Sequence, residues 1–301
     1  MTNAPRILVT GGTGQVGIEL GRRSGAVVAP GRAELDLDNS DEIVAMVGSQ
    51  PWSAVINAAA YTAVDQAESD VAAAWRLNAV APAILATETA RLGIPLVHVS
   101  TDYVFDGGKA GAYLPTDPTG PLGVYGASKL AGEIAVRSAS PRHAIIRTAW
   151  VVSAHRANFV KTMLRVGGER DHLRVVADQR GSPTSAADLA DALLVIAARL
   201  AAPATPGGTW HFVNCGEASW HDLAGAIFAG SARRGGAVPA IEPIATADYP
   251  TPARRPANSR LDTTTLERDF GIKPRPWQLA LDDILAELLD GQPPGRSTTP
   301  A

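Results

Sequence analysis

The sequence lacks the features of several protein classes. A single cysteine, Cys215, excludes both an internal disulfide framework and a multi-cysteine metal site. We expect its thiol to be buried as a small apolar group. The most apolar stretch, 189–202, is interrupted by Asp191 and Arg199, so it is too short to cross a membrane. The first residues show no signal-peptide pattern. These absences predict a cytoplasmic protein without a membrane partner.

A strong excess of charge of either sign is also absent. The chain has 27 Lys and Arg against 30 Asp and Glu, a formal net charge of -3. Such a balance gives no general attraction to nucleic acid, which we therefore do not expect as a partner. An anionic ligand must instead bind locally, at placed arginines or helix N-termini. At 301 residues the chain can bury a large core in one large or two modest domains.

Short apolar runs alternate with helical patterns over the first two-thirds of the chain, most regularly before residue 150. The runs predicted as strands are 6–10, 26–29, 54–57, 95–100 and 143–148. They lack inside/outside alternation, which is typical of strands covered on both faces. The predicted helices are 14–24, 40–50, 71–92 and 125–138, the second of them capped by Asn39 and Ser40. Strands alternating with helices predict an α/β fold with a Rossmann-like, doubly wound parallel sheet.

The regular alternation of predicted strands and helices is lost after residue 150. Helical patterns at 158–168, 185–201, 219–229, 263–270 and 277–289 are separated by short segments such as 209–214. We predict an NAD(P)-binding Rossmann domain at 1–150, with about 175–215 contributing to its sheet. Residues 151–290 then form mainly a smaller C-terminal α/β substrate lobe. The Pro/Gly/Ser/Thr-rich tail 291–301 is predicted to be disordered.

A glycine-rich turn follows the first predicted strand. Gly11, Gly14 and Gly17 stand in TGGTGQVG, between that strand and a helix. Such glycines permit a tight turn, close approach of the backbone to a pyrophosphate, and close packing of the helix on the sheet. The helix N-terminus adds free N–H groups and a positive dipole end. The alternative is a glycine turn without a ligand, but the strand–turn–helix context predicts a dinucleotide site.

The residues after the second predicted strand favour NADPH over NADH. The acidic residue usual at that place is absent, and Arg32 follows Pro30 and Gly31 instead. An arginine there can accept a 2′-phosphate, although it can also be an ordinary solvated side chain. Asp36 and Leu37 lie where an acidic residue usually approaches the adenine. NADH stays possible as the cofactor.

Tyr125 and Lys129 are four residues apart and therefore share one face of a predicted helix. A free phenol has a pKa of about 10, and a neighbouring ammonium is expected to lower it toward the working pH. The same lysine can hold ribose hydroxyls. The alternative is an ordinary surface pair.

A third catalytic group is expected at the carboxyl end of the fourth strand, where open α/β sheets bind ligands. Ser100 and Thr101 both offer a hydroxyl there, and their spacing does not choose between them. Strand-end turn bonding is the alternative for both. Together with the tyrosine–lysine pair, this hydroxyl predicts a carbonyl reductase.

The chain resembles the extended short-chain dehydrogenase/reductases, and within them most closely the dTDP-4-dehydrorhamnose reductase family. The resemblance extends to about residue 289 and rests on TGGTGQVG, NAAAYTAVDQAE (57–68), STDYVFDG (100–107), VYGASKLAGE (124–133), RTAWV (147–151) and DQRGSPT (178–184). The most specific segment is YPTPARRPANSRLD (249–262). The resemblance implies reduction of dTDP-4-dehydro-L-rhamnose to dTDP-L-rhamnose, for cell-envelope polysaccharide.

The resemblance also implies roles for single residues. Tyr125 is the proton donor, Lys129 its partner and Thr101 the hydroxyl that tunes it. Further cofactor contacts fall on Gly14, Gln15, Val16, Asp36, Leu37, Ala60, Tyr61 and Thr62. Substrate contacts fall on Thr101, Asp102 and Trp150, with core packing as the alternative for the tryptophan. Arg254, Arg255 and Arg260 can engage a diphosphate, although surface ion pairing is expected for one of the three.

Some members of the family are dimers with a magnesium ion held between subunits by glutamates. Glu19 and Glu287 fall at two of those positions, but the third carries Ala187. We therefore assign no metal ligand and predict either a monomer or a homodimer. Two other functions stay open: a nucleotide-sugar epimerase, and a non-catalytic regulatory subunit of the same fold, like the vertebrate one that binds methionine adenosyltransferase.

Overall fold

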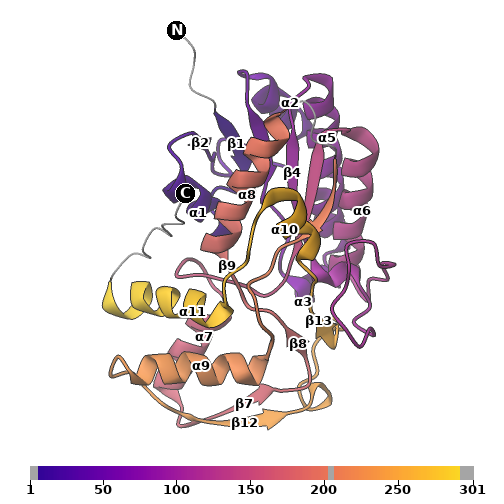
Figure 1. Cartoon of the computed structure of the whole chain (residues 1–301). Coiled ribbons are helices and arrows are strands. Elements are labelled where there is room, and N and C mark those ends of the chain that lie inside the picture. Colours follow the sequence, from indigo (N-terminus) through magenta and orange to yellow (C-terminus); the bar gives the residue numbers. More distant parts are fainter. Residues whose placement is uncertain (1–5, 203–206, 292–301) are drawn as a thin grey trace.

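The computed structural model describes residues 6–202 and 207–291, and its main sheet has six parallel strands (Figure 1). Their spatial order is β10-β5-β4-β3-β1-β2. The strands are β1 (Ile7–Thr10), β2 (Val27–Val28), β3 (Ala54–Asn57), β4 (Leu96–Thr101), β5 (His143–Thr148) and β10 (Gly208–His211). The predicted doubly wound parallel sheet is confirmed. The bounds predicted for β3 and β5 are those observed.

Helices cover both faces of this sheet (Figure 1). On one face lie α1 (Gln15–Arg23) and α8 (Ala186–Ala201), and on the other α2 (Ser40–Gly48), α5 (Ala81–Arg91) and α6 (Val124–Ala139). Neighbouring strand residues serve the two cores in turn: Val55 packs with Leu85 of α5, and Ile56 packs with Leu193 of α8. Both faces therefore require apolar side chains, which explains the missing alternation in the sequence.

The strand order reverses next to β1. The chain runs from β1 to β2 on one side, then returns to β3 on the other side of β1. In an open parallel sheet this reversal leaves a crevice at the carboxyl ends of the strands, where ligands bind. The sheet therefore sets the location of the site before any side chain is considered.

The predicted helix 71–92 contains a π-helical turn that the sequence pattern does not reveal. It comprises α4 (Val71–Trp75), the π turn Arg76–Val80 and α5, and it follows the short α3 (Val64–Ala67). The turn carries Asn78, whose buried side chain accepts from the Tyr61 N–H at 2.9 Å and donates to Ser128 Oγ at 3.0 Å. The π turn thus ties the segment after β3 to α6.

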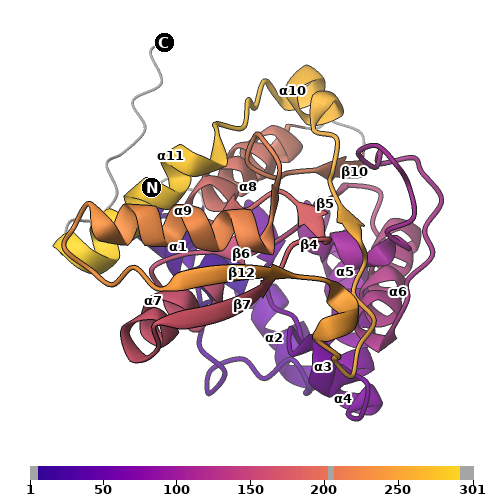
Figure 2. The same cartoon turned by 90° about the horizontal axis from the view of Figure 1, so that it is seen from below.

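The second lobe packs helices against a two-stranded parallel pair, best seen from below (Figure 2). The pair is β7 (His172–Val176) and β12 (Ala240–Ile244), and the helices are α7 (Phe159–Glu169), α9 (Trp220–Ala232) and α11 (Trp277–Leu285), continued by the π turn Ala286–Asp290. Two small sheets join it: β6 (Val151–Val152) with β9 (Thr184–Ser185), and β8 (Arg180–Gly181) with β11 (Ala218–Ser219) and β13 (Asn258–Ser259). α10 (Thr264–Phe270) lies against β10, and single 3-10 turns occur at Asp102–Val104 and Thr246–Asp248.

The expectation that Cys215 is buried is wrong. Its thiol is exposed, and the residue is held through its main chain instead: its N–H donates to the Arg275 carbonyl at 2.9 Å, and its own carbonyl accepts from the Trp277 N–H at 3.0 Å. The predicted disordered tail 291–301 lies outside the described residues apart from Gly291. Among the described residues no helix is both long and apolar enough to span a bilayer. The domain boundary near residue 150 stays a prediction.

Candidate active site

A cavity of about 590 Å³ opens at the strand-order reversal, along the carboxyl ends of β1, β3 and β4. Most residues predicted to bind cofactor or substrate line it: Gly11, Gly14, Gln15, Val16, Arg32, Asp36, Leu37, Ala60, Thr62, Thr101, Asp102, Tyr125, Lys129 and Trp150. Five predicted residues are not part of the lining: Gly17, Tyr61, Arg254, Arg255 and Arg260. Residues from distant parts of the sequence thus meet in a single cavity.

The glycine-rich turn presents main chain to this cavity. Gly11 has φ of 77°, and a Cβ atom there would lie 2.7 Å from the Ala59 nitrogen, so only glycine fits. α1 begins after Gly14 without a side-chain cap and without an acidic residue in its first turn. Its first N–H groups are therefore available to an anion. Gly17 lies inside α1, against the Gly11 carbonyl rather than in the cavity.

Arg32 reaches the cavity from the segment after β2. Its side chain is 74% exposed and makes only long contacts, 3.6 Å to Asp36 and 3.5 Å to Asp38. Water screens such pairs strongly, so they contribute little to stability. The guanidinium is therefore free to bind a phosphate.

Tyr125 stands in the first turn of α6, directly against the loop after β4. A Cβ atom at Gly126 would lie 2.1 Å from the Tyr103 carbonyl oxygen, so the helix touches this loop main chain to main chain. The Tyr103 and Tyr125 rings meet edge to face with centroids 5.3 Å apart. The contact brings the Tyr125 phenol within hydrogen-bonding reach of the Thr101 hydroxyl.

Burial controls the protonation of the tyrosine and the lysine. It raises the pKa of the Tyr125 phenol well above its usual value, and the hydrogen bond with Thr101 opposes the rise. Burial also lowers the pKa of Lys129 to about 8, and its Nζ donates to the Val99 carbonyl at 2.7 Å. The expectation that the ammonium lowers the tyrosine pKa is therefore wrong, because desolvation dominates and Nζ is directed at a main-chain carbonyl.

The two hydroxyls at the end of β4 have different partners. Ser100 Oγ donates to Glu133 Oε1 at 2.6 Å, whereas Thr101 Oγ1 lies between Tyr125 and Asp102, donating to Asp102 Oδ1 at 3.0 Å. The geometry therefore favours Thr101 as the hydroxyl that faces the reacting group. Burial raises the pKa of Asp102 itself to about 6.

Glu133 belongs to a buried ion pair that the sequence reasoning missed. Arg147 donates to it bidentately, Nε to Oε1 at 2.8 Å and Nη2 to Oε2 at 2.7 Å. Both side chains are almost fully buried. A bidentate pair of this kind fixes α6 against β4 and β5, which holds the site elements in place. An arginine inside an apolar strand, HAIIRT, was the available signal.

Trp150 lies at the boundary between the cavity and the second lobe. Its φ of 50° is in the left-handed region, which is unusual for a bulky residue and typical of functional sites. Its indole stacks on Trp220 with ring centroids 3.7 Å apart and planes 13° apart. The packing predicted as the alternative is observed for this ring, which also lines the cavity; its contact with the sugar stays a prediction.

The three predicted diphosphate arginines lie beyond the cavity lining. Arg255 donates to Asp65 at 2.7 Å and to the hydroxyl of Tyr103, which does line the cavity. Arg260 pairs with Glu217 at 2.9 Å. Arg254 is exposed and makes no hydrogen bond or ion pair among the described residues. Their role toward a diphosphate stays a prediction.

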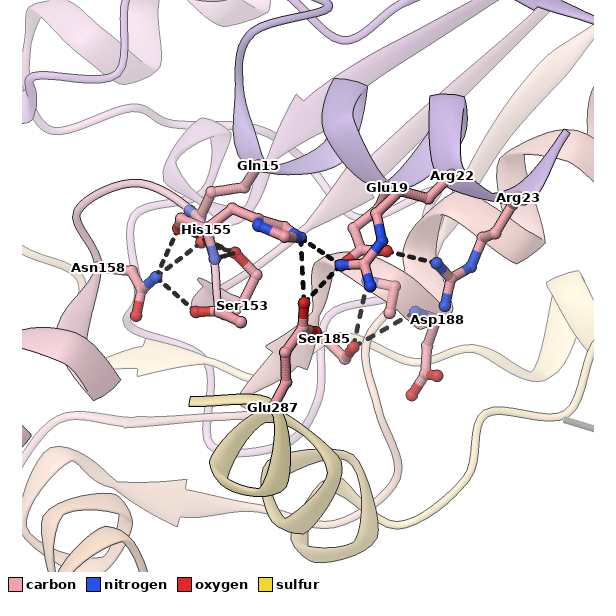
Figure 3. Close-up of polar contacts among 12 residues, drawn as sticks. Gln15, Glu19, Arg22, Arg23, Ser153, His155, Asn158, Ser185, Asp188 and Glu287 are labelled. Carbon is pink, nitrogen blue, oxygen red and sulfur yellow. Dashed lines mark hydrogen bonds and ion pairs between the residues drawn. The ribbon is translucent and has the colours of Figure 1, made fainter. Parts of the chain in front are cut away.

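The positions implied for a magnesium ion form an ion-pair network around helix α1 (Figure 3). We call Glu19, Arg22, Arg23, His155 and Glu287 the α1 cluster. Arg22 Nη1 lies 2.6 Å from Glu287 Oε1, 2.8 Å from His155 Nε2 and 3.7 Å from Glu19 Oε1.

This donor set does not fit magnesium, because a guanidinium already lies among the carboxylates. Glu19, His155 and Glu287 each offer a ligand atom within 4.8 Å of the other two, but Arg22 Nη1 lies among these atoms, and the third family position is the buried, apolar Ala187.

Arg156 also lines the cavity, and the sequence reasoning missed it. It lies in the segment between β6 and α7, and its Nε donates to the Thr13 carbonyl of the glycine-rich turn at 2.6 Å. No motif marks this residue, and it meets Thr13 across 143 positions of sequence.

A glycine-rich turn after β1, a Tyr–Lys pair on one helix and a threonine at the end of β4 together define a short-chain dehydrogenase/reductase. The family model described as RmlD substrate binding domain matches residues 5–289. The chain belongs to the dTDP-4-dehydrorhamnose reductase family.

Relatives and solved structures extend over nearly the whole chain. A dTDP-4-dehydrorhamnose reductase from Burkholderia thailandensis is 46% identical, over 94% of this chain and 99% of the relative. One from Escherichia coli is 40% identical, over 94% of this chain and 97% of the relative. The structure of dTDP-4-dehydrorhamnose reductase from Bacillus anthracis in complex with NADP superimposes with a TM-score of 0.88 at 32% identity, covering 94% of this chain and 99% of that one.

Proposed function

We propose that the chain reduces dTDP-4-dehydro-L-rhamnose to dTDP-L-rhamnose with NADPH, for cell-envelope polysaccharide. The observation that carries this proposal is the meeting of Thr101, Tyr125 and Lys129 beside the glycine-rich turn, in one cavity. The named relatives match nearly end to end, and one related structure holds NADP. NADPH fits the residues present, because α1 offers an uncapped N-terminus and Arg32 an exposed guanidinium that makes only long contacts.

Tyr125 is the proton donor in this proposal. The cofactor, when bound, supplies the hydride to the sugar C4. A raised pKa keeps the phenol protonated at neutral pH, which is the form that an acid must have. Thr101 orients the phenol and the C4 oxygen, and the proton passes from the phenolic oxygen to that oxygen as the carbonyl becomes an alcohol.

Lys129 and the surrounding residues position the reactants. With a pKa of about 8, Lys129 is mostly charged at pH 7 and can donate to ribose hydroxyls from its place on α6. Asp102 and Trp150 face the sugar, and Arg254, Arg255 and Arg260 serve the substrate diphosphate. We propose that the protein acts in the cytoplasm, as a monomer or a homodimer.

The test is to mix the protein with NADPH and enzymatically made dTDP-4-dehydrorhamnose, and to follow the absorbance of the reduced cofactor. The proposal expects stoichiometric NADPH consumption, with dTDP-L-rhamnose identified by chromatography and NMR. Flat absorbance contradicts it. An epimerase would convert the sugar without net consumption of cofactor, and a regulatory subunit would leave both unchanged.

A further inference from the structure

The segment 153–158, between β6 and α7, is fastened to the cofactor-binding end of α1 (Figure 3). Gln15 Oε1 accepts from Ser153 Oγ at 2.7 Å and from Asn158 Nδ2 at 3.0 Å. His155 Nε2 lies 3.1 Å from Glu19 Oε1, one turn further along the helix. The main chain of the segment is therefore held in place by contacts at both of its ends and in its middle.

Arg156 is the residue that this fastening directs at the cavity. Its φ is 54°, a left-handed conformation that costs free energy for any residue with a Cβ atom. Its Nε donates to the Thr13 carbonyl, one residue before the uncapped start of α1 at Gly14. Among the described residues its two Nη groups have no hydrogen-bond partner. Arg156, with a strained main chain and unpaired Nη groups in the described part of the chain, therefore lies next to the N-terminus of α1, whose first N–H groups can bind an anion.

We propose that Arg156 binds the diphosphate of the dinucleotide cofactor, together with the N-terminus of α1. The inference rests on the proposed function, in that it takes NADPH as the cofactor. A guanidinium forms short, charge-assisted bonds with phosphate oxygens, and here one of its N–H groups is already oriented by Thr13.

The cavity then divides the anionic groups of the cofactor between two arginines. Arg32, beside Asp36 and Asp38 after β2, meets the 2′-phosphate, and Arg156 meets the diphosphate. A rival explanation is that Arg156 only fastens its segment to Thr13. In that case its guanidinium serves the fold and not the ligand.

Binding measurements on the whole protein separate these explanations without any need for turnover. Isothermal titration calorimetry gives the Kd of three ligands: NADPH, ADP-ribose and 2′-AMP. ADP-ribose has the diphosphate but no 2′-phosphate, whereas 2′-AMP has the 2′-phosphate but no diphosphate. The variants are Arg156→Ala, Arg156→Gly and Arg32→Ala. Arg165→Ala removes an exposed arginine whose ion-pair partner in the described part of the chain is Glu169 on α7, and it is the matched control for loss of charge.

We expect Arg156→Ala to weaken NADPH and ADP-ribose about tenfold each, and to leave 2′-AMP within twofold. Arg32→Ala should show the opposite pattern for the two fragments. Arg156→Gly separates the loss of the guanidinium from a change in backbone strain, because glycine adopts a φ of 54° without strain. It should bind ADP-ribose as weakly as Arg156→Ala does.

Unchanged affinity for ADP-ribose in Arg156→Ala, or wild-type affinity in Arg156→Gly, would overturn the assignment while leaving the proposed function intact. Failure of the unmodified protein to bind NADPH would contradict the proposed function, and this inference with it.

Discussion

The active-site cavity and the α1 cluster each contain a buried ionisable side chain, but the two side chains differ in how well their charge is compensated. In the cavity, Lys129 is almost fully buried and its Nζ donates to the Val99 carbonyl; burial lowers its pKa to about 8, although the charge of Glu133 opposes the drop. In the α1 cluster, the equally buried Glu19 lies beside two arginines and an imidazole. The charge of Lys129 is only partly compensated, which costs stability, whereas each arginine of the α1 cluster pairs with carboxylates: Arg22 with Glu19 and Glu287, and Arg23 with Glu19 and Asp191.

This difference indicates which group serves the fold and which serves a ligand. The α1 cluster joins α1, the segment after β6 and the C-terminal π turn, and its charges are satisfied within the chain. In the cavity, by contrast, burial shifts the pKa of Tyr125 and of Lys129 away from its usual value, and the fold gains no stability from this shift. Such perturbed groups in a cleft are typical of catalytic sites. Four substitutions test this contrast.

The largest effect is expected in the cavity, from Tyr125→Phe. Turnover should fall by roughly 10²–10⁴-fold, because the proton donor is removed, while the Kd of NADPH stays the same. Steady-state rates and fluorescence titration measure the two quantities. Tyr249→Phe, at an exposed tyrosine, is the control and should change neither. Near-normal turnover in Tyr125→Phe means that another group donates the proton.

In the α1 cluster, Glu19→Gln should lower the free energy of unfolding by about 1–3 kcal/mol, because Arg22 and Arg23 lose an almost fully buried partner and keep only their more exposed partners Glu287 and Asp191. Urea denaturation measures this. The control, Glu169→Gln, breaks an exposed pair with Arg165 and should cost about 0.5 kcal/mol or less. Equal losses in the two variants would show that the α1 cluster has no special role in stability.

Lys129→Met should change stability in the opposite direction. The lysine pKa is about 8 in the folded protein and about 10.4 in an unfolded chain, so unfolding takes up a proton between these values. The native lysine is therefore destabilising below pH 8, and this cost vanishes as the pH rises toward 10. We expect Lys129→Met to be about 1–3 kcal/mol more stable at pH 7 and to lose this advantage by pH 10.

Urea denaturation at several pH values checks this expectation. Lys273→Met, at a side chain that is 78% exposed, should show no such pH dependence. A Lys129→Met protein that is less stable than wild type at pH 7 would show that the bond from Nζ to Val99 outweighs desolvation.

The smallest effect is expected from magnesium. Millimolar magnesium should leave the thermal midpoint of the protein unchanged relative to sodium at equal ionic strength, because Arg22 lies among the carboxylates. Arg22→Ala removes that guanidinium, so only this variant should gain stability from the ion. Differential scanning calorimetry measures the thermal midpoint. A higher midpoint of the unmodified protein in magnesium would show that the metal displaces the Arg22 guanidinium.

Much of the fold was predictable, because buried parallel strands and long helices leave strong patterns. Strands β3 and β5 were predicted to the residue, and the Asn39 cap of α2 accepts from Asp41 and Glu42 as expected. The small strands of the second lobe were missed, because two-residue pairings such as β6 with β9 are set by tertiary contacts. The π turn at Asn78 was also missed, since it preserves the helical apolar pattern around it.

The candidate site was predictable where a motif carries its geometry. Gly11 and the pair Tyr125 and Lys129 follow from local spacing, and all three line the cavity. The direction of the tyrosine pKa did not follow, because desolvation depends on the whole enclosure and not on a neighbour four residues away. Arg156 did not follow either, since it meets the glycine-rich turn only after the chain has folded.

The contact at Gly126 bears on how such a site can acquire new substrates. Gly126 has no side chain, so α6 approaches the Tyr103 carbonyl directly, and this approach helps to set the gap between Thr101 and Tyr125. Exchanges elsewhere in the wall of the cavity leave that gap as it is. The second lobe can therefore diversify toward other sugars while the spacing of the reacting groups is inherited unchanged.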